Sequence, residues 1–160
     1  MSTALFPGSF DPLHNGHFDI IEIASRCFDR VLIAAIRNPG KASSLFTLEE
    51  RKAMIEECVI PLGNVQVIPM KTLTVNVAKQ HGADVIVKGL RVAADFEYEL
   101  QQAHMNKAIS GVQTLFIPCG TANSFIASSL VKEIAKLDGA DRVEQFVPAP
   151  VFKRLKEKFA

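Results

Sequence analysis

The sequence has few cysteines, no long apolar run and almost no net charge. Its three cysteines, Cys27, Cys58 and Cys119, are an odd number without metal-site spacing, which disfavours a disulfide framework or a zinc module. We expect reduced thiols in a cytoplasmic protein. The N-terminus lacks the features of a signal peptide, and no apolar run reaches the about 18 residues of a membrane span. We therefore expect no membrane association.

The charge balance limits the classes of partner. Eighteen basic and seventeen acidic residues give a net charge of +1. Such a balance argues against nucleic acid or another polyanion held by bulk charge, but it permits a local basic pocket. A chain of 160 residues, 48% apolar and 22% charged, is typical of a single globular domain, which we expect to span residues 1–160.

Short apolar runs alternate with helical patterns along the chain. The continuously apolar run from Val31 to Ile36 predicts a strand covered on both faces. The predicted strands are 3–6, 30–36, 65–69, 84–88 and 113–118, and the predicted helices are 16–28, 48–59, 74–80, 95–109, 125–137 and 151–159. The alternation predicts an α/β fold, a doubly wound five-stranded parallel sheet of Rossmann-like type. The last helix is basic on one side, which we interpret as a solvated face.

Helix-start signals support these boundaries. Thr47 and Glu50 have the spacing of a capping box, and Asp95 and Ser124 are candidate N-caps of the two following long helices. Ligands of doubly wound sheets bind beyond the carboxyl ends of the strands. Hydroxyl or cationic side chains follow every predicted strand, and those of the candidate site are Ser9, Lys41, Thr74, Lys88, Arg91, Ser124, Ser128 and Ser129. We therefore expect a phosphate site at one edge of the sheet.

The segment from Phe6 to His17 is the most specific part of that edge. A strand, a glycine-containing loop and a helix N-terminus together form a phosphate-binding geometry. His14 and His17 lie one turn apart, and Gly16 permits close approach of a backbone or a phosphate. Zinc is disfavoured because no further ligand cluster completes a site. Capping explains one histidine but two poorly, so we interpret them as donors to phosphate oxygens.

Two further segments carry candidate contacts. Lys88 and Arg91 flank Gly89 after a strand, and the alternative is a solvated loop. Three acids at 95–99 offset a helix dipole, although Glu99 could also accept from a ligand. In the segment 123–129, Ser124 is best explained as an N-cap, whereas Ser128 and Ser129 inside a helix suggest a second phosphate contact.

These motifs together resemble the His-x-Gly-His nucleotidyltransferases, a superfamily shared with class I aminoacyl-tRNA synthetases. More narrowly, the chain resembles bacterial phosphopantetheine adenylyltransferases from about residue 3 to about residue 155. The resemblance is carried by residues 7–12 (PGSFDP), 14–17 (HNGH), 46–51 (FTLEER), 89–91 (GLR), 94–99 (ADFEYE) and 128–133 (SSLVKE).

The resemblance implies that ATP and 4'-phosphopantetheine react in line to give dephospho-coenzyme A and pyrophosphate, with Mg²⁺ on the nucleotide phosphates. It implies His17 as the catalytic residue that stabilises the transition state, and a homohexamer. The ATP contacts that it implies are Ser9, Phe10, His17, Gly89, Leu90, Arg91, Glu99, Asn123, Ser124, Phe125, Ile126, Ala127, Ser128 and Ser129. The implied phosphopantetheine contacts are Ser9, Lys41, Thr74 and Lys88.

The chain departs from the usual family pattern at several positions. Ser9 replaces threonine, Lys88 replaces arginine and loses the bidentate fork, Asn123 replaces an aromatic residue, and Ala127 replaces a serine. His14 stands where threonine is common. Two alternatives follow: a related adenylyl- or cytidylyltransferase for another phosphorylated acceptor, such as nicotinate mononucleotide or glycerol phosphate, and a non-catalytic sensor of nucleotide or coenzyme A.

Overall fold

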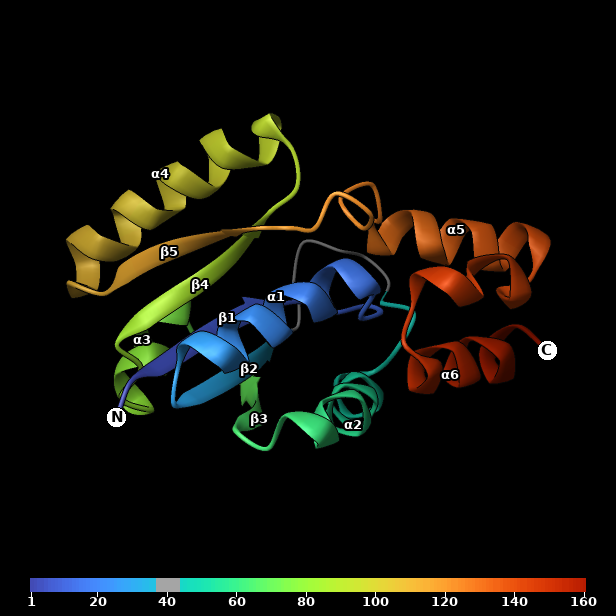
Figure 1. Ribbon diagram of the computed structural model, residues 1–160, viewed down its shortest axis with the longest axis horizontal. Helices are drawn as coiled ribbons and strands as arrows, with labels where there is room; N and C mark the ends of the chain where they lie inside the picture. Colours follow the sequence, from blue (N-terminus) through green and yellow to red (C-terminus); the bar gives the residue numbers. More distant parts are fainter. Residues whose placement is uncertain (37–43) are drawn as a thin grey trace.

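A computed structural model describes residues 1–36 and 44–160 of the protein. Its sheet has five strands in the order β3-β2-β1-β4-β5, and all neighbouring pairs are parallel (Figure 1). The strands are β1 (Thr3–Gly8), β2 (Arg30–Ile36), β3 (Val65–Met70), β4 (Val85–Leu90) and β5 (Gln113–Pro118). The predicted α/β fold is therefore confirmed, with strand boundaries that differ by two residues at most.

The helices are α1 (Asn15–Cys27), α2 (Leu48–Val59), α3 (Thr74–Gln80), α4 (Ala93–Ser110), α5 (Ser128–Asp138) and α6 (Ala149–Phe159), with short 3-10 helices at Ile60–Leu62 and Ala140–Phe146. Helix α2 has the predicted capping box, because the Thr47 hydroxyl accepts from Glu50 N–H at 3.1 Å and the Glu50 carboxylate accepts from Thr47 N–H at 2.7 Å. No helix in the described ranges is both long and apolar enough to cross a membrane.

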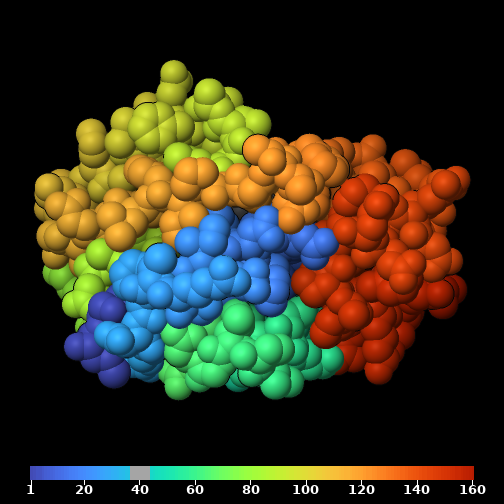
Figure 2. Space-filling view, in the orientation of Figure 1, coloured from blue at the N-terminus to red at the C-terminus, as the bar shows by residue number. Residues whose placement is uncertain are grey.

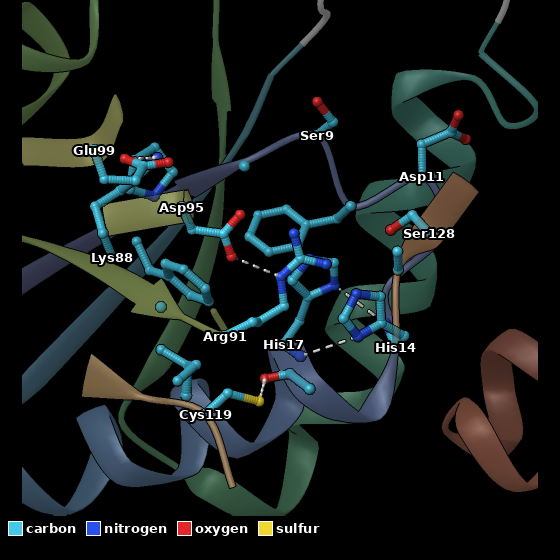
Figure 3. Close-up of a pocket in the computed structure, with 18 of the residues that line it drawn as sticks. Ser9, Asp11, His14, His17, Lys88, Arg91, Asp95, Glu99, Cys119 and Ser128 are labelled. Atoms are coloured by element: carbon cyan, nitrogen blue, oxygen red, sulfur yellow. Dashed lines mark hydrogen bonds and ion pairs between the residues drawn. The ribbon is translucent and has the colours of Figure 1, made fainter. Parts of the chain in front are cut away.

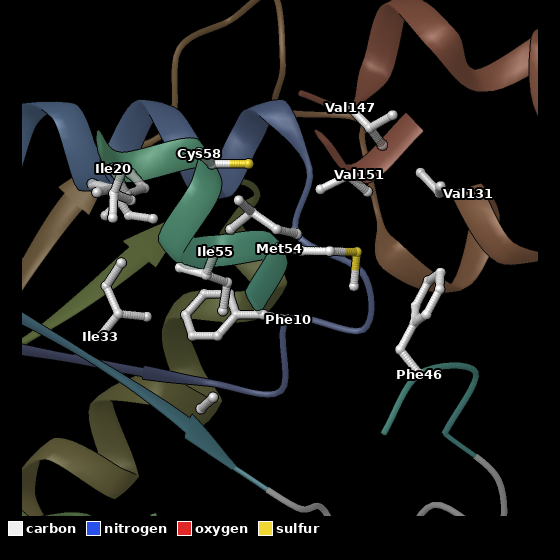
Figure 4. Close-up of a cluster of buried hydrophobic side chains, with 14 of the residues drawn as sticks. Phe10, Ile20, Ile33, Phe46, Met54, Ile55, Cys58, Val131, Val147 and Val151 are labelled. Atoms are coloured by element: carbon white, nitrogen blue, oxygen red, sulfur yellow. The ribbon is translucent and has the colours of Figure 1, made fainter. Parts of the chain in front are cut away.

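Alternation along β1 divides the core between the two faces of the sheet. Ala4 and Phe6 belong to the larger cluster, which α1, α2, α5 and α6 complete (Figure 4). Leu5 belongs to a smaller cluster, which Val75 and Ala78 of α3 complete. Ala103 is the one buried residue of the long helix α4. Figure 2 shows α4 standing out at the top of the molecule beside β5.

Two predicted helix starts are wrong. Asp95 lies within the first turn of α4, whose N-cap is Val92. Helix α5 begins at Ser128, not at 125, and Ala127 is its N-cap in place of the expected Ser124. The apolar pair Phe125 and Ile126 resembles the start of a helical pattern. In the structure both residues lie in the loop before α5, where Ile126 is buried.

The basic side of α6 is paired with acidic neighbours. Arg154 contacts Glu57 at 2.8 Å, and Lys158 contacts Glu50 of α2 at 3.5 Å. Lys156 forms a further pair with Asp141 at 3.1 Å. The side chains of Lys156 and Lys158 are 55% and 39% exposed, so the interpretation as a solvated face is confirmed, and these surface pairs contribute little to stability.

Candidate active site

A cavity of about 410 Å³ lies beyond the carboxyl ends of β1 and β4 (Figure 3). Strand order reverses between these two strands, which is where doubly wound sheets bind ligands. The loop after β1, the first turn of α1, the end of β4, the start of α4 and the start of α5 supply its walls. The cavity therefore lies at the edge of the sheet where the sequence predicted a phosphate site.

Most of the predicted site residues meet in this cavity, although their roles stay predictions. Those that line it are Ser9, Phe10, His17, Lys88, Gly89, Arg91, Glu99, Ala127, Ser128 and Ser129. Those that do not are Leu90, Thr74, Asn123, Ser124, Phe125 and Ile126. Lys41 lies outside the described residues. Several lining residues were not among those predicted, including Asp11, Asp95 and Cys119.

His14 and His17 cap the same helix reciprocally. Nδ1 of His14 accepts from His17 N–H at 3.3 Å, and Nδ1 of His17 accepts from His14 N–H at 3.2 Å. Their rings stack with centroids 3.6 Å apart. The expectation that capping would explain two histidines poorly was wrong, because each imidazole replaces one residue of a capping box.

This capping fixes where each imidazole can donate. A ring nitrogen that accepts an N–H carries no proton, so the network assigns the proton of both neutral rings to Nε2. Burial is the main cause that lowers the pKa of His14 to about 4, with a contribution from the Arg91 charge. Burial, His14 and Arg91 also lower the pKa of His17 well below its usual value. Both rings are therefore neutral at pH 7 and can donate through Nε2.

The Phe10 ring packs against the His17 ring. Its ring is 2% exposed and meets the His17 ring edge-on, with centroids 5.1 Å apart. A Cβ at Gly8 would lie 2.8 Å from the Phe10 ring, which explains the glycine at that position. Because the ring is buried, only the backbone of Phe10 is placed to meet a ligand.

Acidification should destabilise the fold through these histidines. The folded-state pKa of His14, about 4, lies below the value of 6.5 for a free histidine, so the unfolded chain binds more protons between these limits. Stability is then fully present above pH 6.5 and is lost as pH falls. We expect the free energy of unfolding to drop by about 2 kcal/mol or more from pH 7 to pH 5, as measured by urea denaturation.

His14→Asn provides the control for this prediction. Asparagine keeps a capping acceptor for the His17 N–H but does not titrate. The drop between pH 7 and pH 5 should shrink by about 2 kcal/mol in this variant. An undiminished drop would show that His14 is not the group responsible.

The two cations after β4 are paired with acids of α4. Lys88 lies 3.1 Å from Glu99, and Arg91 lies 3.2 Å from Asp95. Both pairs line the cavity. The acids at the start of α4 thus pair with two cations as well as facing a helix dipole. Lys88 lies within β4 and its side chain is 23% exposed, so the interpretation as a solvated loop is wrong for it, whereas the Arg91 side chain, just after the strand, is 37% exposed. An entering phosphate would have to share or exchange these partners.

The start of α5 forms the opposite wall. The Ser128 hydroxyl donates to the Pro12 carbonyl at 2.9 Å, and Arg91 donates to the Ile126 carbonyl at 3.1 Å. The N-cap residue Ala127 has no side chain that could occupy the first N–H groups of the helix. An uncapped helix N-terminus that opens on a cavity favours an anion.

The loop at 119–127 packs closely on α1. Asn123 donates to the Asp19 carboxylate at 2.7 Å, and a Cβ at Gly16 would lie 3.1 Å from the Asn123 carbonyl oxygen. The expected close backbone approach at Gly16 is therefore confirmed. Asn123 holds the loop against α1 and does not itself line the cavity.

Asp11 joins three segments at the floor of the cavity. Its carboxylate accepts from Lys132 at 2.8 Å and from the backbone N–H groups of Leu45 and Phe46 at 3.0 Å each. Burial raises the pKa of Asp11, but the bonds from Lys132, Phe46 and Leu45 outweigh it and lower the pKa below its usual value. Asp11 is therefore ionised and structural.

Thr74 does not line the main cavity. Thr74 lines a neighbouring cavity of about 20 Å³ that shares Lys88 and Glu99 with it. Within residues 1–36 and 44–160, no group of three metal-binding side chains occurs. The cavity carboxylates Asp11, Asp95 and Glu99 each already face a cation, so Mg²⁺ fits better on the phosphates of a nucleotide.

Comparisons with known proteins show the family of the chain. The model of the cytidylyltransferase-like family matches residues 5–134. The phosphopantetheine adenylyltransferase of Synechococcus sp. (strain JA-2-3B'a(2-13)) is 50% identical over 98% of this chain and 97% of its own. That of Alkaliphilus oremlandii is 46% identical over 99% of this chain and 100% of its own.

Solved structures agree on the fold. A Vibrio parahaemolyticus protein named as a nicotinate-nucleotide adenylyltransferase superposes with a TM-score of 0.67 at 20% identity, over 97% of this chain and 99% of its own. A lipopolysaccharide core biosynthesis protein of Thermoplasma volcanium superposes with a TM-score of 0.56 at 19% identity, over 75% of this chain and 97% of its own. The chain therefore belongs to the cytidylyltransferase-like family and, within it, to the phosphopantetheine adenylyltransferases.

Proposed function

We propose that the protein transfers the adenylyl group of ATP to 4'-phosphopantetheine, giving dephospho-coenzyme A and pyrophosphate. The observation that carries this proposal is identity of 45–51% over nearly the whole chain with proteins of that name. The cavity supports it, because imidazole, hydroxyl and cationic groups meet where phosphate groups of two substrates could lie side by side. We expect the acceptor phosphate to attack the α-phosphorus in line.

His17 is our proposed catalytic residue. Its Nε2–H is the free donor of a neutral ring, and the transferring phosphoryl group gathers charge on its equatorial oxygens. Arg91 and the first turn of α5 would hold the remaining phosphates of ATP. The whole chemistry then consists of positioning and charge stabilisation, with no general base.

We assign the other contacts by position in the family. Ser9, Lys41, Thr74 and Lys88 would hold phosphopantetheine. ATP would contact Ser9, the Phe10 backbone, residues 89–91, Glu99 and residues 123–129, although only 127–129 of this last segment line the cavity. Mg²⁺ would bind the ATP phosphates and offset the charge of the leaving pyrophosphate.

The acceptor assay tests this proposal. The protein is incubated with ATP, Mg²⁺ and, separately, phosphopantetheine, nicotinate mononucleotide and glycerol phosphate, and pyrophosphate release is measured. We expect pyrophosphate release with phosphopantetheine as the acceptor and none with the other two acceptors. Turnover with another acceptor but not with phosphopantetheine would contradict the proposal, and no turnover with any acceptor would favour the sensor alternative.

We also propose that the protein works in the cytoplasm as a homohexamer. Three free cysteines suit a reducing compartment. Helix α4 and β5 expose a set of large apolar side chains: Phe96, Tyr98, Met105, Ile109 and Leu115. Light scattering should give a molar mass six times that of one chain. Met105→Asp, which places a charge on this apolar surface, should lower that molar mass. A monomeric wild-type protein would contradict the assembly.

A further inference from the structure

The buried guanidinium of Arg51 has no part in the chemistry proposed above. Arg51 lies on α2 and is 2% exposed, and it is among the largest fully buried side chains. Within residues 1–36 and 44–160, its hydrogen bonds go to carbonyl oxygens of Thr47, Ser9 and Ile36, and not to a carboxylate. A buried charge is costly unless it is compensated, so its retention calls for a physical reason.

Two of these carbonyls end adjacent strands. Nη1 of Arg51 donates to the Ser9 carbonyl at 2.5 Å and to the Ile36 carbonyl at 2.8 Å. Ser9 directly follows β1, Ile36 is the last residue of β2, and the two strands pair side by side. The guanidinium therefore fastens the start of the histidine loop to the neighbouring strand end.

The bond to Ser9 also fixes the direction of the next peptide group. A trans peptide is planar, so when the Ser9 carbonyl points at Arg51, the Phe10 N–H points the opposite way. Helix α2 does not line the cavity, whereas Phe10 does. Among the described residues, no protein acceptor is bonded to this N–H. With no bond to any described residue, the Phe10 N–H is thus placed as a donor on the cavity side of the loop.

Phe10 has an unfavourable backbone conformation that this direction requires. Its φ is 47°, in the left-handed region that bulky residues avoid. A flip of the Ser9–Phe10 peptide would rotate the φ of Phe10 by about 180°, to a negative value that L-residues ordinarily adopt, and would relieve that strain. The same flip would turn the N–H away from the cavity. A strong donor on the Ser9 carbonyl is what opposes the flip.

We propose that Arg51 is a positioning residue whose guanidinium holds the Ser9–Phe10 peptide so that the Phe10 N–H faces a phosphate group in the cavity. The inference rests on the proposed adenylyl transfer for its kinetic readout. The binding readout is independent of that proposed function, because inorganic pyrophosphate can be titrated into the protein without turnover.

The test compares two buried residues of the same helix. Met54, one turn from Arg51, is fully buried in the core and does not line the cavity (Figure 4). Arg51→Met and Met54→Ala are assayed below their unfolding temperatures for kcat, for KM of ATP and for pyrophosphate affinity by calorimetry. We expect Arg51→Met to lose about 10- to 100-fold in kcat/KM for ATP and to bind pyrophosphate more weakly, with Met54→Ala within twofold of wild type.

Arg51→Lys keeps the inference testable if Arg51→Met does not fold. Lysine retains the charge but is shorter and has one nitrogen in place of the Nη1 and Nε that bond the carbonyls of Ser9, Ile36 and Thr47, so a smaller loss of about threefold or more is expected. Wild-type kinetics and pyrophosphate affinity in a folded Arg51 variant, or a parallel loss in Met54→Ala, would overturn the inference. A wild-type protein that binds pyrophosphate but transfers nothing would instead contradict the proposed function, and the binding comparison would still decide the role of Arg51.

Discussion

His17→Asn should lower kcat by about 10²–10³-fold while the protein stays folded. The asparagine Oδ1 can take the place of Nδ1 and accept the His14 N–H, so the cap of α1 is kept. It places no donor where Nε2 stood, and the charge that develops on the α-phosphate loses one hydrogen bond. Steady-state pyrophosphate release at saturating ATP and phosphopantetheine measures the effect.

Two further variants separate the functions of the ring. His17→Ala removes both the cap and the donor, so it should match His17→Asn in kcat and be less stable. His17→Gln can place an amide N–H near the position of Nε2, and it should recover part of kcat. A raised KM with unchanged kcat in His17→Asn would show that His17 merely binds substrate.

Asp11→Ala should lower the free energy of unfolding by about 3 kcal/mol. The substitution leaves the Leu45 and Phe46 N–H groups and the Lys132 ammonium without their acceptor. Lys132→Met should cost less, because Asp11 retains both backbone donors. Urea denaturation of both variants measures these losses.

The double variant isolates the ion pair. If Asp11 and Lys132 act together, the loss in the double variant should fall short of the sum of the single losses by about 1 kcal/mol or more. Strict additivity would show that the 2.8 Å contact between them contributes nothing to stability.

Local signals in the sequence were sufficient for most of the fold. The run at 30–36 is a strand with the predicted boundaries, because its apolar pattern coincides with burial in the sheet. The run at 113–118 also has its predicted boundaries, although none of its residues is fully buried. Helix α2 also has its predicted boundaries, since the capping box at Thr47 and Glu50 is purely local. The start of α5 was misplaced because Phe125 and Ile126 continue an apolar pattern that the tertiary fold uses in a loop.

The sequence predicted where the site lies in the fold, but not which of its side chains pair with one another. The carboxyl ends of parallel strands meet at one edge of the sheet, so the sequence predicted that four residues lie close together: Ser9, His17, Lys88 and Arg91. The ion pair of Asp11 with Lys132 spans 121 positions, and no local signal reveals it. Arg51 did carry a signal, because it shares a helical face with Met54, Ile55 and Cys58, all of which are buried.

The stereochemistry at the α-phosphorus tests the account most directly. His17 Nδ1 accepts an N–H, so Nε2 carries the proton and the ring acts as a donor without the free lone pair of a nucleophile. ATP with one α-phosphate oxygen replaced by sulfur, as a single diastereomer, is turned over with phosphopantetheine, and the configuration of the product is determined. A single in-line attack predicts inversion. Retention would mean two displacements through a covalent enzyme intermediate, and it would contradict the role assigned to His17.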